Sequence, residues 1–500
     1  MDKKLYLNTS TSLIYQIVAI ICGFILPRCF LSVYGSEVNG LVASITQFLS
    51  FISLMDLGIN AVVKASLYKP LAEKDHYMTS AIMVSAKKFY NKIILIFLIY
   101  VIALCFLLPL TVNSSFDPIF TITLIIAMAI NIIGQYYFGI LNQTIIDADQ
   151  KLYINSFLQI VTLILNTVIS VVLMLCFDVS VQFVKLVSSL IFLLRPLYLL
   201  FYVRKHYELD YSTTYSEEPI KQKWNGVYQH IASVILNNTD VIVLTLFSTL
   251  VNVSIYNIYS LVVIGVKNII IAMTSGIQSK MGHLLAQNKT QELNSFFSKM
   301  EFSLHSIVIF FFTATAVLII PFVTVYTSGI NDANYIIPSF GLLLTLSQLF
   351  YCLRLPYSQL VLAAGHFKQT QASALIEVAL NIIISVVLVW NYGLIGVAIG
   401  TIVAMGYRTI YYVLYIKKNI LYRPLTKFWK LMLTNVIIFS VSYILCKGFS
   451  LAGVNYFSWI VLAFQCCFVI GMVMIATNVI FHSERVKQMG KEKLKWRTKR

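Results

Sequence analysis

Residues 93–112 read IILIFLIYVIALCFLLPLTV, an uninterrupted apolar run with no charged side chain. A run of about twenty such residues spans the roughly 30 Å hydrocarbon layer of a bilayer as one α-helix. A strand of a membrane barrel would instead alternate apolar and polar residues over about ten positions. The stretch therefore predicts a transmembrane helix.

The same character extends over the whole chain of 500 residues, of which 59% are hydrophobic and 11% are charged. The mean hydropathy is +0.81. Soluble domains carry about 25% charged residues, so a water-soluble protein is excluded. The expected fold is an all-α integral membrane protein of about fourteen transmembrane helices, at 12–34, 39–63, 93–112, 118–140, 154–177, 181–203, 227–248, 251–274, 303–326, 337–363, 371–390, 393–416, 430–449 and 457–481.

The distribution of basic residues predicts the orientation, because cytoplasmic segments of membrane proteins are enriched in Lys and Arg. With the N-terminus inside, 30 of the 37 Lys and Arg residues fall in cytoplasmic segments, whereas the outer connections hold Lys447 alone. Both termini are therefore expected in the cytoplasm. The net charge of +17 then indicates contact with anionic membrane lipids rather than with nucleic acid.

Two short matches indicate an internal duplication. The segment Asn166–Leu173 (NTVISVVL) recurs further along the chain as Asn381–Leu388 (NIIISVVL). In the next span, Arg195 and the tyrosine and basic residues that follow it match Arg408 and its followers at nearly the same offset. Each repeat holds six spans, an even number, so we expect the repeats to be related by an axis along the membrane normal.

The duplication predicts how the chain is divided. The expected parts are a first six-helix bundle (1–205), a cytoplasmic linker (206–226), a second, pseudo-symmetric six-helix bundle (227–418), an extra helix pair (419–481) and a basic cytoplasmic tail (482–500). Two bundles that rock about a central site would provide alternating access.

Six basic residues lie inside predicted spans, where a charge costs about 2.5–3.5 kcal/mol on insertion scales. They are Arg28, Lys185, Arg195, Lys267, Arg354 and Arg408. The acids clearly inside are Asp240 and Glu377. The interior is therefore net cationic, and its ligand is expected to be anionic. A diphosphate fits, because guanidinium groups bind phosphate oxygens in pairs.

Arg28, Lys267 and Arg354 lie well inside their spans and are the candidate substrate-binding residues, with a structural ion pair as the alternative for each. Arg195 and Arg408 are closer to the cytoplasmic ends of their spans. Their long side chains would either line the cavity or reach the interface as anchors.

Asp240 and Glu377 are the candidates for ion coupling or for an intramembrane pair. Asp240 stands one position from the repeat equivalent of Arg28, so an ion pair across the cavity and a local pair with a neighbouring helix are both open. Glu377 has Thr162 at its equivalent position. It would bind a proton or cation, or form a hydrogen bond between helices.

Other motifs are discounted. Asp147 and Asp149 spell the D-x-D of metal-dependent glycosyltransferases, but they stand in a short loop with no nucleotide-binding domain around it. No Walker sequence occurs, and the eight cysteines fall in spans without metal-ligand spacing. We therefore expect no catalytic residues, no metal and no cofactor, and the protein is not expected to be an enzyme.

The order of several loose motifs resembles the polysaccharide flippases (Wzx type) of the multidrug/oligosaccharidyl-lipid/polysaccharide exporter superfamily. The motifs are Arg28, Val33–Leu41 (VYGSEVNGL), Asp56–Ile59 (DLGI), Asp240 and Ala364–Lys368 (AGHFK). The resemblance implies a bacterial cytoplasmic membrane protein that moves an undecaprenyl-diphosphate-linked repeat unit for a capsule, O-antigen or exopolysaccharide. It also implies a cationic cavity with Arg28 as a diphosphate or sugar-acid contact, and polysaccharide polymerase machinery as a partner.

Three alternatives stay open at this point. A drug or metabolite cation antiporter of the same superfamily should carry acids in its first bundle, where spans 1–6 hold only Asp56. A lipid-linked peptidoglycan precursor is a further substrate for a flippase. A membrane-embedded polysaccharide enzyme would need substantial outer loops, and none here exceeds about a dozen residues.

Overall fold

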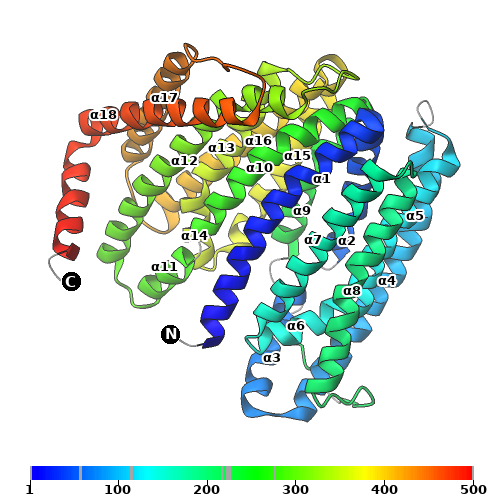
Figure 1. Ribbon diagram of the computed structural model, residues 1–500. Helices are drawn as coiled ribbons and strands as arrows, with labels where there is room; N and C mark the ends of the chain where they lie inside the picture. Colours follow the sequence, from blue (N-terminus) through cyan, green and yellow to red (C-terminus); the bar gives the residue numbers. More distant parts are fainter. Residues whose placement is uncertain are drawn as a thin grey trace. The chain divides into compact units, whose positions relative to one another are not determined.

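The computed structural model describes residues 3–55, 59–112, 116–215, 218–220, 227–274 and 276–497, and all regular secondary structure among them is helical (Figure 1). Parts of three sequence features lie outside the described residues: positions 56–58 of the DLGI motif, 216–217 and 221–226 of the linker, and 498–500 of the tail. The side chains of 484–497 lie outside them as well.

The elements in the first part of the chain are α1 (Lys3–Leu49), α2 (Ile52–Met55), α3 (Ile59–Glu73), α4 (His76–Val112), α5 (Pro118–Gly134), the π-helix η1 (Gln135–Gly139), α6 (Ile140–Ala148), α7 (Leu152–Cys176), α8 (Val181–His206) and α9 (Val227–Phe247). The later elements are α10 (Leu250–Met273), α11 (Ile277–Ala286), α12 (Thr290–Tyr326), α13 (Pro338–Leu353), α14 (Leu355–Ala363), α15 (Phe367–Tyr392), α16 (Leu394–Asn419), α17 (Leu425–Cys446) and α18 (Tyr456–Arg497).

The fourteen predicted spans all fall on these helices. Within the described residues, eleven helical stretches are long and apolar enough to cross a membrane, and the first of them, Ser10–Leu54, holds the predicted span 12–34 and the larger part of the span 39–63, whose positions 56–58 lie outside the described residues. The other two predicted spans fall on α9, whose apolar part is shorter, and on the pair α13–α14, which a break divides. The expected all-α membrane fold is confirmed.

The two faces of α4 explain why this sequence suits a bilayer. One face is buried and includes Phe97 and Leu104. The opposite face is also apolar, yet Phe106 and Leu110 on it are 70% and 74% exposed. A helix that is apolar all round loses nothing when its outer face meets lipid, whereas in water that face would be costly.

Gly35 divides α1 into two helical parts, as the first two predicted spans require. Its backbone (φ 78°, ψ 177°) interrupts the helix. A positive φ is strained for residues with a Cβ atom but not for glycine, so the glycine at this position permits the break.

The helix bounds repeat along the chain. The helices α4 and α12 are both 37 residues long and begin at His76 and Thr290. The helices α8 and α16 are both 26 residues long and begin at Val181 and Leu394. Both spacings agree closely with the offsets of the two sequence matches. The pseudo-symmetric repeat therefore extends through the helices, while the rotation that relates the repeats stays a prediction.

The fourth span is broken at the same place in both repeats. In the first repeat the π-helix η1 ends at Gly139, between α5 and α6. In the second, α13 ends and α14 begins around Arg354, the repeat equivalent of Gly139. Discontinuous helices and π-bulges recur at the binding sites of transporters. The break therefore marks a region to search for a site.

By packing, the chain forms two compact units, Met1–Ile255 and Tyr256–Arg500. In the first, an apolar core joins α1, α3, α4, α5, α6, α7 and α8. In the second, α17 and α18 pack on α12 through a smaller apolar cluster that includes Leu318, Cys446 and Cys466. The division expected at the linker 206–226 stays a prediction.

Candidate functional site

One group of buried charges in the second unit lies around Glu377 on α15, which is 2% exposed. Its Oε1 accepts a short hydrogen bond from Arg354 Nη1, and its Oε2 lies 3.7 Å from Arg408 Nε. Two of the predicted site residues, Arg354 and Glu377, are thus brought together. We call Arg354, Glu377 and Arg408 the Glu377 cluster.

The local sequence explains why the helix is interrupted at Arg354. Pro356 lies in the first turn of α14, where a proline needs no amide donor. The amide of Tyr357, which would bond the Leu353 carbonyl in a continuous helix, donates to the Arg354 carbonyl instead (3.0 Å). Arg354 therefore lies at the junction of two helices.

Lys267 on α10 approaches the same cluster through an aromatic ring. Its Nζ lies 4.9 Å from the ring centroid of Tyr351, and the Arg354 Cζ lies 4.4 Å from that centroid. The negative face of the ring stabilises both cations. Arg354 and Arg408 therefore lie beside one carboxylate, with Lys267 next to them across the Tyr351 ring, and the group keeps an excess of positive charge inside the predicted spans.

Arg408 is held inside the protein and does not extend to the interface. It is 3% exposed, and it donates to the Thr370 carbonyl (3.2 Å), the Ser373 hydroxyl (2.5 Å) and the Tyr412 hydroxyl (2.7 Å). These contacts tie α16 to α15. The interfacial-anchor interpretation therefore does not apply to Arg408 in this structure.

Arg195 occupies the equivalent position on α8 of the first unit. Its Nη2 donates to Gln143 Oε1 (2.6 Å) on α6, and its Nε donates to Asn155 Oδ1 (3.0 Å) on α7. The partners that these bonds provide are neutral. The first repeat therefore uses its arginine to hold three helices together.

Arg28 is half-buried on α1, directly after Pro27. Asp240 is buried on α9, whose other residues bind the end of α1 and the turn after it: Ser44 of α1 shares a hydrogen bond of 2.7 Å with Thr245, and Ser50 of the turn donates to Asn238 (2.7 Å). Both residues thus lie in the first unit. An Arg28–Asp240 ion pair stays a prediction.

The D-x-D motif is engaged within the first unit. Asp149 pairs with Lys151 (2.7 Å) and accepts from the Tyr207 hydroxyl (2.7 Å). Burial opposes the charge of Lys151, but the Asp149 carboxylate outweighs it and raises the pKa of that lysine. Burial, with the same carboxylate, raises the pKa of Tyr207. Within the described residues, no group of three potential ligands could hold a metal ion.

Sequence reasoning missed Glu301, which it placed in the cytoplasmic segment before the ninth span. The helix α12 begins at Thr290, so Glu301 lies inside it and is 1% exposed. His305 follows one turn later and is fully buried. The spacing of Glu301 and His305 at i and i+4 on an apolar helix is the sequence feature that could have indicated this buried pair.

The fold is shared with transporters. No family model matches the chain, and no curated protein matches it. The chain resembles the structure of "Lipid II flippase MurJ, inward closed conformation" with a TM-score of 0.68 and 17% identity, over 96% of this chain and 100% of that one. It also resembles an inward-facing "multidrug resistance MATE family transporter of the MOP superfamily" with a TM-score of 0.63 and 13% identity, over 80% of this chain and 95% of that one.

A third similar structure, a MATE protein in complex with MaD5, has a TM-score of 0.52 and 14% identity, over 84% of this chain and 98% of that one. The chain therefore has the fold that these solved structures share, and it is a multi-pass membrane protein. Its identity to each of these structures is too low to transfer a substrate.

Proposed function

We propose that the protein is a flippase that moves a polyprenyl-diphosphate-linked oligosaccharide from the inner to the outer leaflet of the bacterial cytoplasmic membrane. The observation that carries the proposal is the excess of positive charge buried at the Glu377 cluster, at the broken fourth helix of the second repeat. An anionic head group is the complementary ligand, which Arg354 and Lys267 would bind. Arg28 is the substrate contact proposed in the first unit.

The proposed transport mode is alternating access. Arg354 already has a carboxylate partner, so an incoming diphosphate would compete with Glu377 for its guanidinium. Arg408 would then hold Glu377, and the cluster would stay satisfied in both states. A buried ion pair that can exchange partners in this way avoids leaving a charge alone in a low-dielectric interior.

The proposal includes a cellular setting. The oligosaccharide would be a repeat unit for a capsule, O-antigen or exopolysaccharide, and polysaccharide polymerase machinery would receive it. Both termini would be cytoplasmic, with anionic lipids around the basic segments. Because one similar structure is named a lipid II flippase, a peptidoglycan precursor stays an alternative substrate. Because others are MATE transporters, cation antiport stays an alternative function.

The experiment uses the full chain in proteoliposomes that contain a fluorescent polyprenyl-diphosphate oligosaccharide, with a membrane-impermeant glycosidase outside. Wild-type protein should expose inner-leaflet substrate to the enzyme. Arg28→Ala should abolish this transfer, and Arg28→Lys should restore it in part, because an ammonium keeps the charge but loses the bidentate fork. Lys447→Ala, which changes a lysine of an outer connection, is the control.

The alternatives give different results in the same vesicles. Transfer of a lipid-linked peptide-bearing precursor in place of the oligosaccharide would favour the peptidoglycan substrate. Export of organic cations with no transfer of either lipid would favour the antiporter and overturn the proposal, as would full transfer by a stably folded Arg28→Ala protein.

A further inference from the structure

A second buried polar group lies in the unit Tyr256–Arg500, apart from the Glu377 cluster. It contains the only described acid–histidine pair that shares a face of one membrane helix at i and i+4: Glu301 and His305 on α12, which are 1% and 0% exposed. Carboxylates and imidazoles are rarely buried in a membrane without a partner or a function. The contacts of the pair decide what it can bind.

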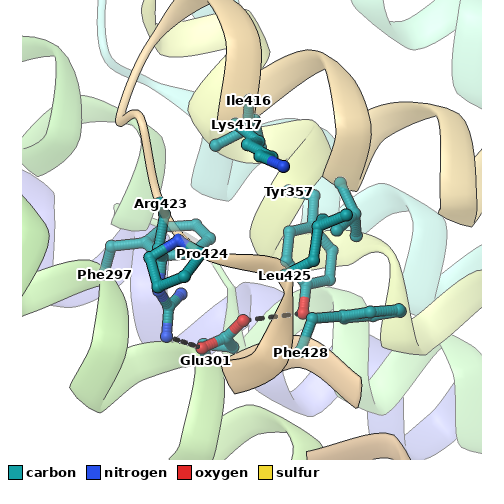
Figure 2. A pocket seen from close by; sticks show the side chains of 10 residues that line it. Phe297, Glu301, Tyr357, Ile416, Lys417, Arg423, Pro424, Leu425 and Phe428 are labelled. Atoms are coloured by element: carbon teal, nitrogen blue, oxygen red, sulfur yellow. Dashed lines mark hydrogen bonds and ion pairs between the residues drawn. The ribbon is translucent and has the colours of Figure 1, made fainter.

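Glu301 is held between two elements (Figure 2). Its Oε1 accepts a hydrogen bond of 2.8 Å from the Tyr357 hydroxyl on α14, and its Oε2 lies 2.6 Å from Arg423 Nη2. Arg423 belongs to the connection between α16 and α17 and is itself 7% exposed. The carboxylate thus joins the broken fourth helix to the start of the extra helix pair.

The hydrogen bonds of His305 define which ring nitrogen carries the proton. Nε2 lies 3.2 Å from the Leu353 carbonyl, an acceptor, so Nε2 must be the donor. Nδ1 lies 3.1 Å from Asn435 Nδ2 on α17, and in the neutral ring it accepts from that amide. The Leu353 carbonyl is the one that the break at Arg354 frees from the Tyr357 amide.

The same hydrogen-bonding groups can also serve the protonated ring. A proton on Nδ1 would turn it into a donor, and rotation of the Asn435 amide would then present Oδ1 to it. The added charge would be close to Glu301, because the Tyr357 hydroxyl bonds Glu301 and lies 3.4 Å from His305 Nε2. His305 can therefore gain a proton without losing a hydrogen bond.

The other charged groups around the pair come from three elements. Arg423 already shares Glu301, and Lys417 of α16 lines the same cavity. On α18, His482 bonds Thr434, the residue before Asn435, and its ring contacts Phe302. Burial of the ring and, to a smaller extent, the two cations oppose a further positive charge, whereas Glu301 favours it. Protonation of His305 would therefore compete with Arg423 for the carboxylate.

A cavity adjoins Glu301 and Tyr357, the two residues of the group that line it. It is lined by Glu301, Tyr357, Lys417, Arg423, Phe297 and Phe428 (Figure 2), and it leaves about 20 Å³ for the centre of a water molecule. This is enough for roughly one water. A water there would be beside Glu301 and the Tyr357 hydroxyl, which lies between the cavity and His305.

We propose that Glu301, His305 and Tyr357 form a proton-binding site whose occupation is part of the transport cycle. The ligand is H⁺, and the elements that it would affect are α14, through Tyr357 and Leu353, and α17, through Arg423 and Asn435. The link to transport rests on the proposed function, whereas the binding of the proton does not.

The binding is tested first, without any substrate. Potentiometric titration of the purified full chain in detergent should show that His305→Gln takes up one proton fewer per molecule than wild type as the pH falls. The matched control is His482→Gln, another buried histidine of the same unit. If the curves of wild type and His305→Gln coincide down to the lowest pH at which the protein stays folded, the site does not exist.

The link to transport is tested in the oligosaccharide proteoliposomes with a pH gradient. One coupled proton shifts the equilibrium ratio of substrate between the leaflets by up to about tenfold per pH unit. We expect wild type and His482→Gln to show this shift and His305→Gln to show none. If His305→Gln does not fold, Tyr357→Phe keeps the ring and should change the pH at which the shift develops.

The outcomes separate the two proposals. Substrate transfer with coincident titration curves would remove the proton site and leave the flippase standing. A one-proton difference without transfer of any lipid-linked oligosaccharide would leave the site standing and remove the flippase. An equal loss of the shift in His482→Gln would show that the effect is not specific to His305 and would overturn its role in transport.

Discussion

The sixth helix of each repeat carries an arginine at the same position, but the surroundings of the two arginines differ. Arg195 on α8 donates to two neutral amide oxygens, those of Gln143 and Asn155. Arg408 on α16 lies beside the carboxylate of Glu377, which also binds Arg354. Arg195 thus bonds neutral amides and has the Asp147 carboxylate one hydrogen bond further away, through Gln143 (3.5 Å), whereas Arg408 lies directly beside a carboxylate in a charged cluster.

Two sequence differences account for this contrast. Thr162 of the first repeat corresponds to Glu377, and Gly139 corresponds to Arg354. A Cβ atom on Gly139 would lie 3.0 Å from the Cβ of Pro196, so the break in the first repeat has little room for a side chain. Because the first repeat keeps the same helix bounds without these charges, the fold does not require the Glu377 cluster. The anionic ligand proposed above would account for its presence in the second repeat.

The largest effect on stability is expected from the carboxylate itself. Glu377→Gln leaves two buried guanidinium groups with no counter-charge in the cluster, and breaking a buried pair in this way costs about 3–5 kcal/mol. Thr162→Val is the matched change in the first repeat. The Thr162 hydroxyl bonds only carbonyls of its own helix among the contacts described, so it should cost less than about 1 kcal/mol.

The measurement is the free energy of unfolding of each purified variant in one detergent. A second change, Arg354→Gln in the Glu377→Gln background, should recover part of the loss, because it removes one of the two uncompensated charges. Equal stability of Glu377→Gln and Thr162→Val would contradict the contrast between the repeats.

A smaller difference is expected for the two arginines. Arg408→Gln leaves Glu377 bound to Arg354 but removes hydrogen bonds to Ser373 and Tyr412, for a cost of about 1.5–3 kcal/mol. Arg195→Gln removes bonds to two amides that can bond each other or water, and should cost about 1 kcal/mol. The same unfolding measurement ranks them. A larger loss of unfolding free energy in Arg195→Gln than in Arg408→Gln would contradict the claim that the arginine of the second repeat is the one held by a charged cluster.

Much of the fold was predictable, because the bilayer imposes a simple physical rule on each span. Uninterrupted apolar runs such as 93–112 located the helices, since no other local structure satisfies the backbone in lipid. The breaks were less predictable. Gly35 separates two spans as expected. The π-helix at Gln135–Gly139 contains no proline that would indicate a break in the sequence, and only the structure shows it.

The charged residues were found in the sequence, but their partners were not. Glu377 and Arg408 stand on two different helices and Arg354 at the junction of two others, and nothing in an apolar sequence states which helix faces are in contact. Glu301 was missed for a different reason. The helix α12 extends beyond its apolar core by more than two turns at its start, so a residue assigned to a loop is buried in a helix.

The smallest expected effect concerns the turn that follows the broken helix in each repeat. Gln150 (φ 59°) follows α6, and Gly365 (φ 72°) follows α14 at the equivalent position. Both turns close in the same way: the amide of Lys151 donates to the Ile146 carbonyl, and the amide of His366 donates to the Val361 carbonyl. The backbone is the same, but only the second repeat has glycine where φ is positive.

Removing the glycine from one turn and adding a glycine to the other should therefore change the free energy of unfolding in opposite directions. A Cβ on Gly365 would meet no atom within 4 Å, so Gly365→Ala costs only the left-handed strain, about 1–2 kcal/mol, less about 0.4–1 kcal/mol for the stiffer unfolded chain. Gln150→Gly should gain up to about 1 kcal/mol by the same two contributions with their signs reversed. The control is Gly406→Ala within α16, where the helical backbone suits alanine and the new Cβ also meets open space, so this change should stabilise by about 0.5–1 kcal/mol. If Gly365→Ala stabilises the protein as Gly406→Ala does, the turn in the second repeat does not hold the left-handed conformation that matches it to the first.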